Sequence, residues 1–305
     1  MRDFEEKDLE RLFKPPEGSG KGTNGKVVVI GGSSLFHGAP LLSLKVASRV
    51  VDMVFFASPE ESLKDVCSKI KSLLPSFIWI PWPEVEEYIG KADAILIGPG
   101  LLRYHGESNK CKTDKICDET GKKTKKITEE LLQKYPEKQW VIDAGSLQTM
   151  DSCCIPPKAI LTPNRKEMKM LFGGEPSFAD GRRPEPMASD EASEGKRSEG
   201  GWVSELARKY NCIIVHKNAE TTVCSPSEAC VVKGGNAGMV KGGTGDVLAG
   251  LTVALAAKND PMLSACAASW IVKKAADQLY EKVGFAYNAD DLTEEIPKVL
   301  GKYFR

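Results

Sequence analysis

Seven short apolar runs are spaced along the chain, and each ends in small or polar residues. They lie at residues 26–34, 52–58, 77–81, 94–101, 140–147, 159–164 and 212–218. Their apolar residues are continuous rather than alternating, which is typical of strands in a parallel sheet that is covered on both faces. Segments with a helical pattern lie between the runs, among them 40–51, 125–135 and 201–210. This alternation predicts an α/β fold, doubly wound, with a mainly parallel central sheet and helices on both faces.

The pattern changes towards the C-terminus. Residues 220–234 form two short apolar stretches around Pro226 and Ser227, which predicts a β-hairpin. The run VLAGLTVALAA that follows Asp246 is apolar nearly all round, so we expect a buried helix there. A second helix should pack after it.

Two segments interrupt the alternation. Residues 103–126 are rich in lysine and polar residues, and residues 173–200 contain few apolar side chains. Both predict surface loops. Because the sequence contains no internal repeat and no clear linker, we expect one domain over residues 21–305, preceded by an N-terminal extension of residues 1–20.

Charge and composition argue against several classes of protein. The chain of 305 residues has 42 Lys and Arg against 42 Asp and Glu, so bulk charge does not favour nucleic acid or a membrane surface as a partner. The lysine-rich run 110–126 lacks interleaved aromatic residues and predicts a solvated loop. No apolar run approaches the length of a membrane span, and the N-terminus has no signal-peptide core. Nine cysteines without a C-x-x-C spacing are typical of a reduced, cytoplasmic protein.

The densest glycine cluster is GNAGMVKGGTGDVLAG, residues 235–250. Glycine weakens regular elements, so such a cluster indicates a close approach of the backbone to another group. The N–H groups of a GGTG turn that opens a helix favour an anion such as a phosphoryl group. Asp246 is placed to accept a proton from an attacking hydroxyl, although aspartate is also a common helix cap. The stretch is neither a Walker A motif nor a Rossmann fingerprint.

Several predicted strands end in residues that packing does not require. These are Gly31-Gly32-Ser33, Gly98-Pro99-Gly100, Asp143-Ala144, Thr162-Pro163-Asn164 and Lys217-Asn218. In an open parallel sheet, ligands bind outside the carboxyl ends of the strands. We therefore expect a binding site at this edge of the sheet.

Together, these motifs resemble those of the ADP/ATP-dependent NAD(P)H-hydrate dehydratases, which have the ribokinase-like fold. The resemblance covers residues 20–300 and is carried in order by GTNGKVVVIGGSSLFHGAP (22–40), ADAILIGPGL (92–101), VIDAGSL (141–147), ILTPNRKEM (160–168), the glycine cluster and YNADDLTEEIP (287–297). The cluster with Asp246 is the most specific of these motifs.

The resemblance implies repair of a damaged nicotinamide cofactor. The S epimer of hydrated NADH or NADPH would be phosphorylated on its ring hydroxyl by ADP or ATP, with Mg²⁺. Elimination of phosphate would then restore NADH or NADPH. Asp246 would be the catalytic base, and the phosphoryl oxygens would be held by the backbone N–H groups of Gly242, Gly243, Thr244 and Gly245.

The resemblance also assigns binding residues. Those matching the contacts to the hydrated cofactor are Ala39, Gly100, Asn164 and Asp246. Those matching the contacts to the adenine nucleotide are Lys217, Asn218, Ala219, Glu220, Thr221 and Gly245. Asn236 and Gly238 would support the glycine turn. No residue is assigned to a metal.

The chain departs from the family pattern at a few positions. Asn164 replaces the usual histidine, Asn218 replaces a glycine after Lys217, and Leu102 follows GPGL where glycine is expected. The residues ahead of the core are too few for the epimerase domain often fused there, so a stand-alone dehydratase domain is expected. This layout favours ADP over ATP as the phosphoryl donor, and family members are commonly homotetramers.

Two other functions remain open. A kinase of the same fold would stop at a stable phosphate ester of a sugar, thiazole or pyrimidine alcohol, since phosphoryl transfer is common to both reactions. A non-catalytic relative would keep the fold and bind adenine nucleotide without turnover. The product of the reaction would distinguish the dehydratase from the kinase.

Overall fold

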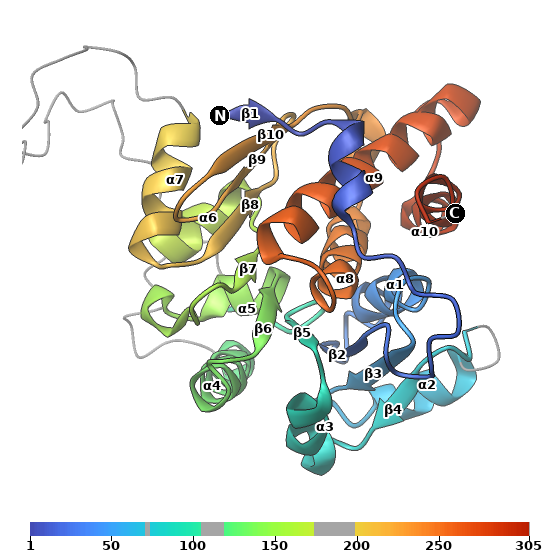
Figure 1. The fold of residues 1–305 in the computed structure, drawn as a ribbon. Helices are drawn as coiled ribbons and strands as arrows, with labels where there is room; N and C mark the ends of the chain where they lie inside the picture. Colours follow the sequence, from blue (N-terminus) through green and yellow to red (C-terminus); the bar gives the residue numbers. More distant parts are fainter. Residues whose placement is uncertain (71–73, 105–118, 174–198, 305) are drawn as a thin grey trace, which may run out of the picture.

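The computed structural model describes residues 1–70, 74–104, 119–173 and 199–304. Within these residues one ten-stranded sheet has the order β1-β10-β9-β8-β7-β6-β5-β2-β3-β4 (Figure 1). The strands are β1 (Arg2–Asp3), β2 (Lys26–Ile30), β3 (Met53–Ala57), β4 (Ile78–Ile80), β5 (Ala94–Ile97), β6 (Gln139–Ile142), β7 (Ile160–Leu161), β8 (Ile213–His216), β9 (Thr221–Cys224) and β10 (Ala229–Val232). All pair in parallel except β9, which runs antiparallel to β8 and β10. The seven predicted strands and the predicted hairpin are confirmed.

Helices cover both faces of the sheet. They are α1 (Gly38–Ala47), α2 (Leu63–Ile70), α3 (Val85–Lys91), α4 (Glu119–Lys134), α5 (Ala144–Thr149), α6 (Arg165–Phe172), α7 (Glu199–Lys209), α8 (Thr244–Ala256), α9 (Pro261–Val283) and α10 (Ala289–Leu300). Short 3₁₀ turns are η1 (Glu6–Arg11), η2 (Trp82–Glu84), η4 (Ser152–Cys154) and η6 (Ala237–Val240).

Successive residues of a strand point to opposite faces, so each central strand contributes to two cores. Val27 and Val29 of β2 pack with α1, α8, α9 and α10, whereas Val28 and Ile30 pack with the helices from α3 to α7. Figure 1 shows these two helical layers. The arrangement confirms the predicted fold class and explains why the apolar runs are continuous. No described helix combines the length and apolarity that crossing a bilayer would need.

The chain reverses its direction of winding beside β2. It runs outward through β3 to β4, then returns to place β5 on the other side of β2 before continuing to β8. The carboxyl ends of β2 and β5 therefore form a switch point, where such sheets bind ligands. The loops there touch, because a Cβ on Gly31 would lie 2.2 Å from Pro99 O, and one on Gly98 (φ +124°) would lie 1.8 Å from Asp143 O.

The N-terminal boundary needs correction. Residues 1–20, predicted as an extension outside the domain, contribute β1, which pairs in parallel with β10. Phe4, Leu9 and Leu12 are buried in the core. The charged sequence MRDFEEKDLERLF hides this role, because its apolar residues find their partners only in the folded sheet.

The predicted loop boundaries also change. Residues 119–126, placed in the loop 103–126, form the first two turns of α4. Lysines spaced through this segment obscure a buried side, where Thr124 is 4 % exposed and a Cβ on Gly121 would lie 2.1 Å from the Tyr104 ring. Similarly, residues 199 and 200 begin α7. Residues 103, 104 and 173 lie in no helix or strand, and the remaining parts of the two predicted loops, 105–118 and 174–198, lie outside the described residues.

Candidate active site

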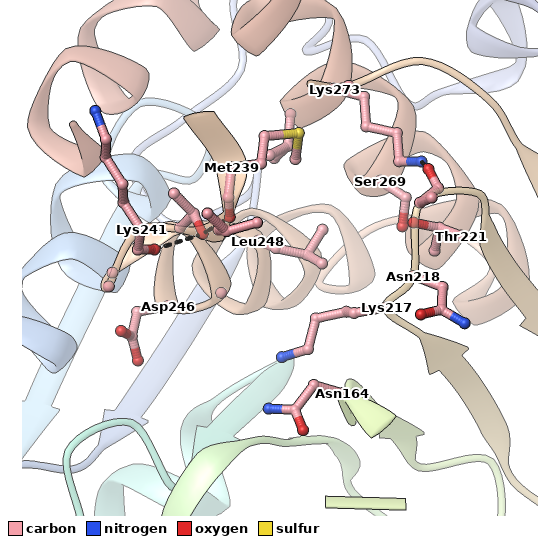
Figure 2. Close-up of a pocket in the computed structure, with 18 of the residues that line it drawn as sticks. Asn164, Lys217, Asn218, Thr221, Met239, Lys241, Asp246, Leu248, Ser269 and Lys273 are labelled. Atoms are coloured by element: carbon pink, nitrogen blue, oxygen red, sulfur yellow. Dashed lines mark hydrogen bonds between the residues drawn. The ribbon is translucent and has the colours of Figure 1, made fainter. Parts of the chain in front are cut away.

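A cavity of about 810 Å³ opens at the carboxyl ends of β6, β7 and β8. Its wall is completed by the loop after β8, the glycine turn before α8, and one side of α9 (Figure 2). Its volume falls within the range of small-molecule and cofactor sites. The cavity brings together Asn164, Lys217 and Asp246, which the sequence predicted from three separate motifs.

The glycine turn leads directly into α8. Gly243 is the N-cap residue with φ +95°, and a Cβ there would lie 2.6 Å from Leu42 and 2.8 Å from Ala289. Glycine is therefore required both by the left-handed backbone and by the contact with α1 and α10. The Thr244 hydroxyl donates to Met239 O at 2.7 Å and fixes the turn. Gly242, Gly243, Thr244 and Gly245 all line the cavity, where the helix N-terminus favours an anion.

Asp246 lies in the first turn of α8, and its backbone carbonyl accepts a hydrogen bond from the Ser43 hydroxyl of α1 at 2.7 Å. Burial, followed by the negative charge of Asp143, raises the pKa of Asp246 to about 7, against the opposing charge of Lys217. A carboxylate that titrates near neutrality can take a proton at physiological pH and release it again. This property favours a base over a simple helix cap.

We expect Asp246→Asn to stabilise the nucleotide-free protein at alkaline pH. The pKa of Asp246 is raised on folding, so the ionised form is destabilised in the folded state, and this penalty grows as pH rises from about 4 to above 7. Asparagine removes it and should add up to about 4 kcal/mol to the unfolding free energy at pH 8. Urea unfolding at pH 8 and pH 4 measures the difference. An equal effect at both pH values would contradict the raised pKa.

Lys217, at the end of β8, holds two buried carboxylates beside Asp246. Its Nζ donates to Asp143 Oδ1 at 3.0 Å and lies 3.9 Å from Glu167 Oε2. Burial raises the pKa of Glu167. Burial alone lowers the pKa of Lys217, but the charges of Asp143 and Glu167 outweigh it and the net shift is upward. The cavity therefore contains a fixed cation that offsets the carboxylates.

Two neutral side chains complete this carboxylate cluster. The Thr162 hydroxyl donates to Asp143 Oδ1 at 2.7 Å, and Gln148 Nε2 donates to Glu167 Oε1 at 2.9 Å. Buried hydrogen-bond networks of this kind hold their members in one geometry.

Asn164 sits where β7 gives way to α6. Its Oδ1 accepts hydrogen bonds from Lys166 N at 2.9 Å and Glu167 N at 3.0 Å, so it caps α6. The Glu167 side chain accepts from Asn164 N in return, which completes a capping box. Asn164 also lines the cavity, and Figure 2 shows its amide nitrogen directed toward the space next to Lys217. Its contact with substrate remains a prediction.

We expect Asn164→Ala to destabilise the protein by about 1 kcal/mol, because two N–H groups of α6 lose their acceptor. For a domain of this size the melting temperature should fall by about 2–4 °C. Thermal unfolding measures this, with Asn164→Asp as the control that keeps the cap. A melting temperature unchanged by the alanine would contradict the capping role.

The predicted nucleotide loop lies along the cavity, with one exception. Lys217, Asn218, Ala219 and Thr221 line it, whereas Glu220 is exposed and does not. Gly245 lines the cavity opposite this loop, and a Cβ there would lie 3.3 Å from Lys217 Nζ. Nucleotide binding by these residues remains a prediction.

The two residues predicted to support the turn are linked by hydrogen bonds. Asn236 Oδ1 accepts from Gly238 N at 3.0 Å and from the Tyr287 hydroxyl at 2.7 Å. A Cβ on Gly238 would lie 2.4 Å from the Tyr287 ring, so a larger residue would push the loop away. These contacts tie the glycine-rich segment to the chain just before α10.

Ala39 and Gly100, predicted to contact the hydrated cofactor, are not in the wall of this cavity. They lie close together at the switch point: a Cβ on Gly100 would be 3.1 Å from Pro40 Cδ, and Ala39 precedes Pro40 in the first turn of α1. The same helix reaches Asp246 through Ser43. Asp246 is therefore connected to both the switch point and the cavity, and the roles of Ala39 and Gly100 stay predictions.

Sequence reasoning assigned no role to three charged residues of the cavity. Asp143 had a signal, since it follows a strand, and Glu167 lies in the quoted segment ILTPNRKEM. Lys273 had no signal in the sequence, because α9 brings it to the cavity only in the folded protein. Lys241 beside the turn also lines the cavity, but its ammonium group points away from it and donates to the carbonyls of Phe285 and Tyr287.

The chain is similar to proteins of one family. The model of the NAD(P)H-hydrate dehydratase family matches residues 27–298. A bifunctional NAD(P)H-hydrate repair enzyme from Methanocaldococcus jannaschii is 33 % identical over 96 % of the chain and 51 % of its own length. An ADP-dependent (S)-NAD(P)H-hydrate dehydratase from Cenarchaeum symbiosum is 29 % identical over 98 % of the chain and 96 % of its own length.

Among solved structures, a ribokinase-like superfamily protein from Enterococcus faecalis superposes with a TM-score of 0.76 at 21 % identity, over 99 % of this chain and 96 % of its own. At this identity the likeness establishes the fold alone. The chain spans about half the length of the bifunctional relatives it matches. Since the family model extends from β2 into α10 and so contains the whole candidate site, this chain belongs to the NAD(P)H-hydrate dehydratase family.

Proposed function

We propose that the protein dehydrates the S epimer of hydrated NADH or NADPH at the expense of ADP or ATP. The observation that carries the proposal is Asp246, a carboxylate with a pKa of about 7 directly after a glycine turn, in a cavity that also holds Lys217. A base and an anion-binding turn side by side are what phosphoryl transfer to a hydroxyl requires.

In the first step, Asp246 accepts the proton of the ring hydroxyl. The hydroxyl oxygen forms a bond to the terminal phosphorus of the nucleotide, and the bond from that phosphorus to the bridging oxygen breaks, so AMP leaves from ADP or ADP leaves from ATP. The N–H groups of Gly243, Thr244 and Gly245 would hold the transferring phosphoryl oxygens. Lys217 would offset charge on the nucleotide side.

In the second step, the carbon–oxygen bond of the ester breaks and inorganic phosphate departs with the bonding electrons. The neighbouring ring carbon loses a proton to the departing phosphate or to water, and its bonding pair forms the carbon–carbon double bond of the dihydronicotinamide. The two steps together remove one water equivalent without net oxidation or reduction. Phosphorylation by the nucleotide thus replaces the poor leaving group hydroxide with the better leaving group phosphate.

The residues of the cavity suit a magnesium ion that binds together with the nucleotide. Among the described residues, no group of three or more His, Cys, Asp and Glu is arranged to hold a metal by itself. Mg²⁺ commonly uses one or two carboxylates together with phosphate oxygens and water. Asp143 suits this, because Thr162 and Lys217 donate to its Oδ1 while its Oδ2 accepts no hydrogen bond from the described residues. The ion would neutralise phosphate charge.

ADP is our preferred phosphoryl donor. A relative matched over nearly its whole length is named as ADP-dependent, which supports this choice. A cytoplasmic location and a homotetramer, both expected from the sequence, stay predictions.

The test is recovery of the absorbance of the reduced nicotinamide from hydrated NADH or NADPH, with Mg²⁺ and either ADP or ATP. Recovery with one nucleotide, together with release of inorganic phosphate, is the expected result and identifies the donor. A stable phosphate ester from a small alcohol would instead indicate the kinase. Nucleotide binding without turnover of any substrate would indicate the non-catalytic relative.

A further inference from the structure

Lys273 places a buried ammonium group in the wall of the cavity. Its side chain comes from α9 and the residue is 4 % exposed. Nζ donates to Ala219 O and to Val232 O, each at 2.9 Å. Within the described part of the chain no carboxylate oxygen lies within ion-pair distance of it. The ammonium is therefore buried against neutral carbonyls alone.

This arrangement is unfavourable for the protein by itself. Burial lowers the pKa of Lys273 to about 8, and the charges of Asp277 and Glu220 only partly oppose the shift. Two carbonyls could be satisfied by a neutral donor, without the penalty of desolvating a charge. An ammonium also has three N–H groups, and the third has no acceptor among the described residues. A charge that is buried in a binding cavity despite this desolvation penalty indicates that a ligand contacts it.

The position of Lys273 indicates which part of a ligand it would meet. In Figure 2, Lys273 and Asp246 lie at opposite ends of the cavity, with Leu248 and Lys217 between them. The phosphoryl end of a nucleotide belongs at the glycine turn beside Asp246. Its base and ribose would then extend toward Lys273, Ser269 and Thr221, which line the other end.

We propose that Lys273 is a nucleotide-binding residue, whose third N–H donates to an acceptor on the base or ribose of the adenine nucleotide. The proposal rests on the proposed function in one respect, namely that the phosphates lie at the glycine turn. It adds a contact that defines the non-phosphate end of the site. Ring nitrogens of adenine and oxygens of ribose are both suitable acceptors.

The surrounding contacts hold Lys273 in place for this role. One turn further along α9, Asp277 accepts from Gly235 N at 3.1 Å and from Asn236 Nδ2 at 3.0 Å. Lys273 binds the loop after β8 through Ala219, and Asp277 binds the segment before the glycine turn. The two residues thus fix both loops of the nucleotide site to one rigid helix, which positions the ammonium before the ligand arrives.

The test compares binding of AMP and of inorganic tripolyphosphate to the full chain by calorimetry. Lys273→Met is expected to weaken AMP binding by about tenfold, the effect of one lost hydrogen bond to a charged group, and to leave tripolyphosphate binding within about twofold. Lys274→Met is the matched control, because this neighbouring lysine is exposed. Lys273→Gln, which keeps a neutral donor for the carbonyls, should also weaken AMP and covers the case in which the methionine variant does not fold.

Three results would overturn the proposal. Equal weakening of AMP and tripolyphosphate would mean that Lys273 acts on the whole loop, including Lys217, or contacts phosphate. Unchanged AMP binding in Lys273→Gln would mean that the positive charge of Lys273 does not contribute to AMP binding. A loss of AMP affinity in Lys274→Met as large as in Lys273→Met would indicate a general effect of charge. None of these readings depends on dehydratase turnover, so failure of the proposed function is detected separately by the absorbance assay.

Discussion

Replacing Asp246 by asparagine is expected to lower the turnover number by about 10³-fold, the range for loss of a general base. The asparagine keeps the size of the side chain and the hydrogen bond from Ser43 to the backbone carbonyl of residue 246, but it cannot accept the hydroxyl proton. ATP and ADP should bind as tightly as to wild type or more tightly, because an anionic group near the transferring phosphate is removed. Steady-state kinetics and calorimetry measure the two effects.

The matched control is Asp65→Asn, on the exposed side of α2, which should leave turnover unchanged. A turnover number within tenfold of wild type for Asp246→Asn would rule out Asp246 as the base. Weaker nucleotide binding in step with lower turnover would instead assign Asp246 to binding.

The pH dependence provides an independent check of the same residue. Because burial and Asp143 raise the pKa of Asp246 to about 7, kcat/KM of the wild type should fall about tenfold per pH unit below that value, as the base becomes protonated. A profile flat down to pH 5 would contradict the assignment.

Replacing Lys217 by methionine is expected to lower the unfolding free energy by about 3 kcal/mol at pH 8. Asp143 and Glu167 have side chains 2 % and 6 % exposed, and both would lose their cation. Burial already raises the pKa of Glu167, and loss of the Lys217 charge would raise it further above that of the unfolded chain, so stability is retained at low pH and lost as pH increases. The difference from wild type should therefore shrink at pH 5.

The Lys217→Met substitution should also change the pH dependence of activity. Lys217 lowers the pKa of Asp246, so its removal moves the acid limb of kcat/KM to higher pH. Urea unfolding and pH–rate profiles measure both effects, with exposed Lys64→Met on α2 as the control. A stability difference that does not vary with pH would contradict the electrostatic role of Lys217.

The sequence predicted the candidate site unevenly. The glycine turn and Asp246 could be recognised because their constraint is local: Gly243 needs a left-handed backbone, and Asp246 follows it in the first turn of one helix. Asn164 was predicted from the strand end before it, but its capping of α6 was not predicted and became visible only in the structure. The sequence did not separate the cavity that holds Lys217 from the switch point that holds Gly100, because both follow strand ends.

The sequence by itself determined the fold class and the edge of the sheet where the site lies, because continuous apolar runs and strand ends are local patterns repeated in order. Only the tertiary structure decided the electrostatics of the site. Lys217 and Asp143 are 74 residues apart, and Lys273 and Ala219 are 54 apart. Burial and the charges of such distant residues set the pKa of Asp246. These quantities depend on distances in space, which no pattern along the chain records.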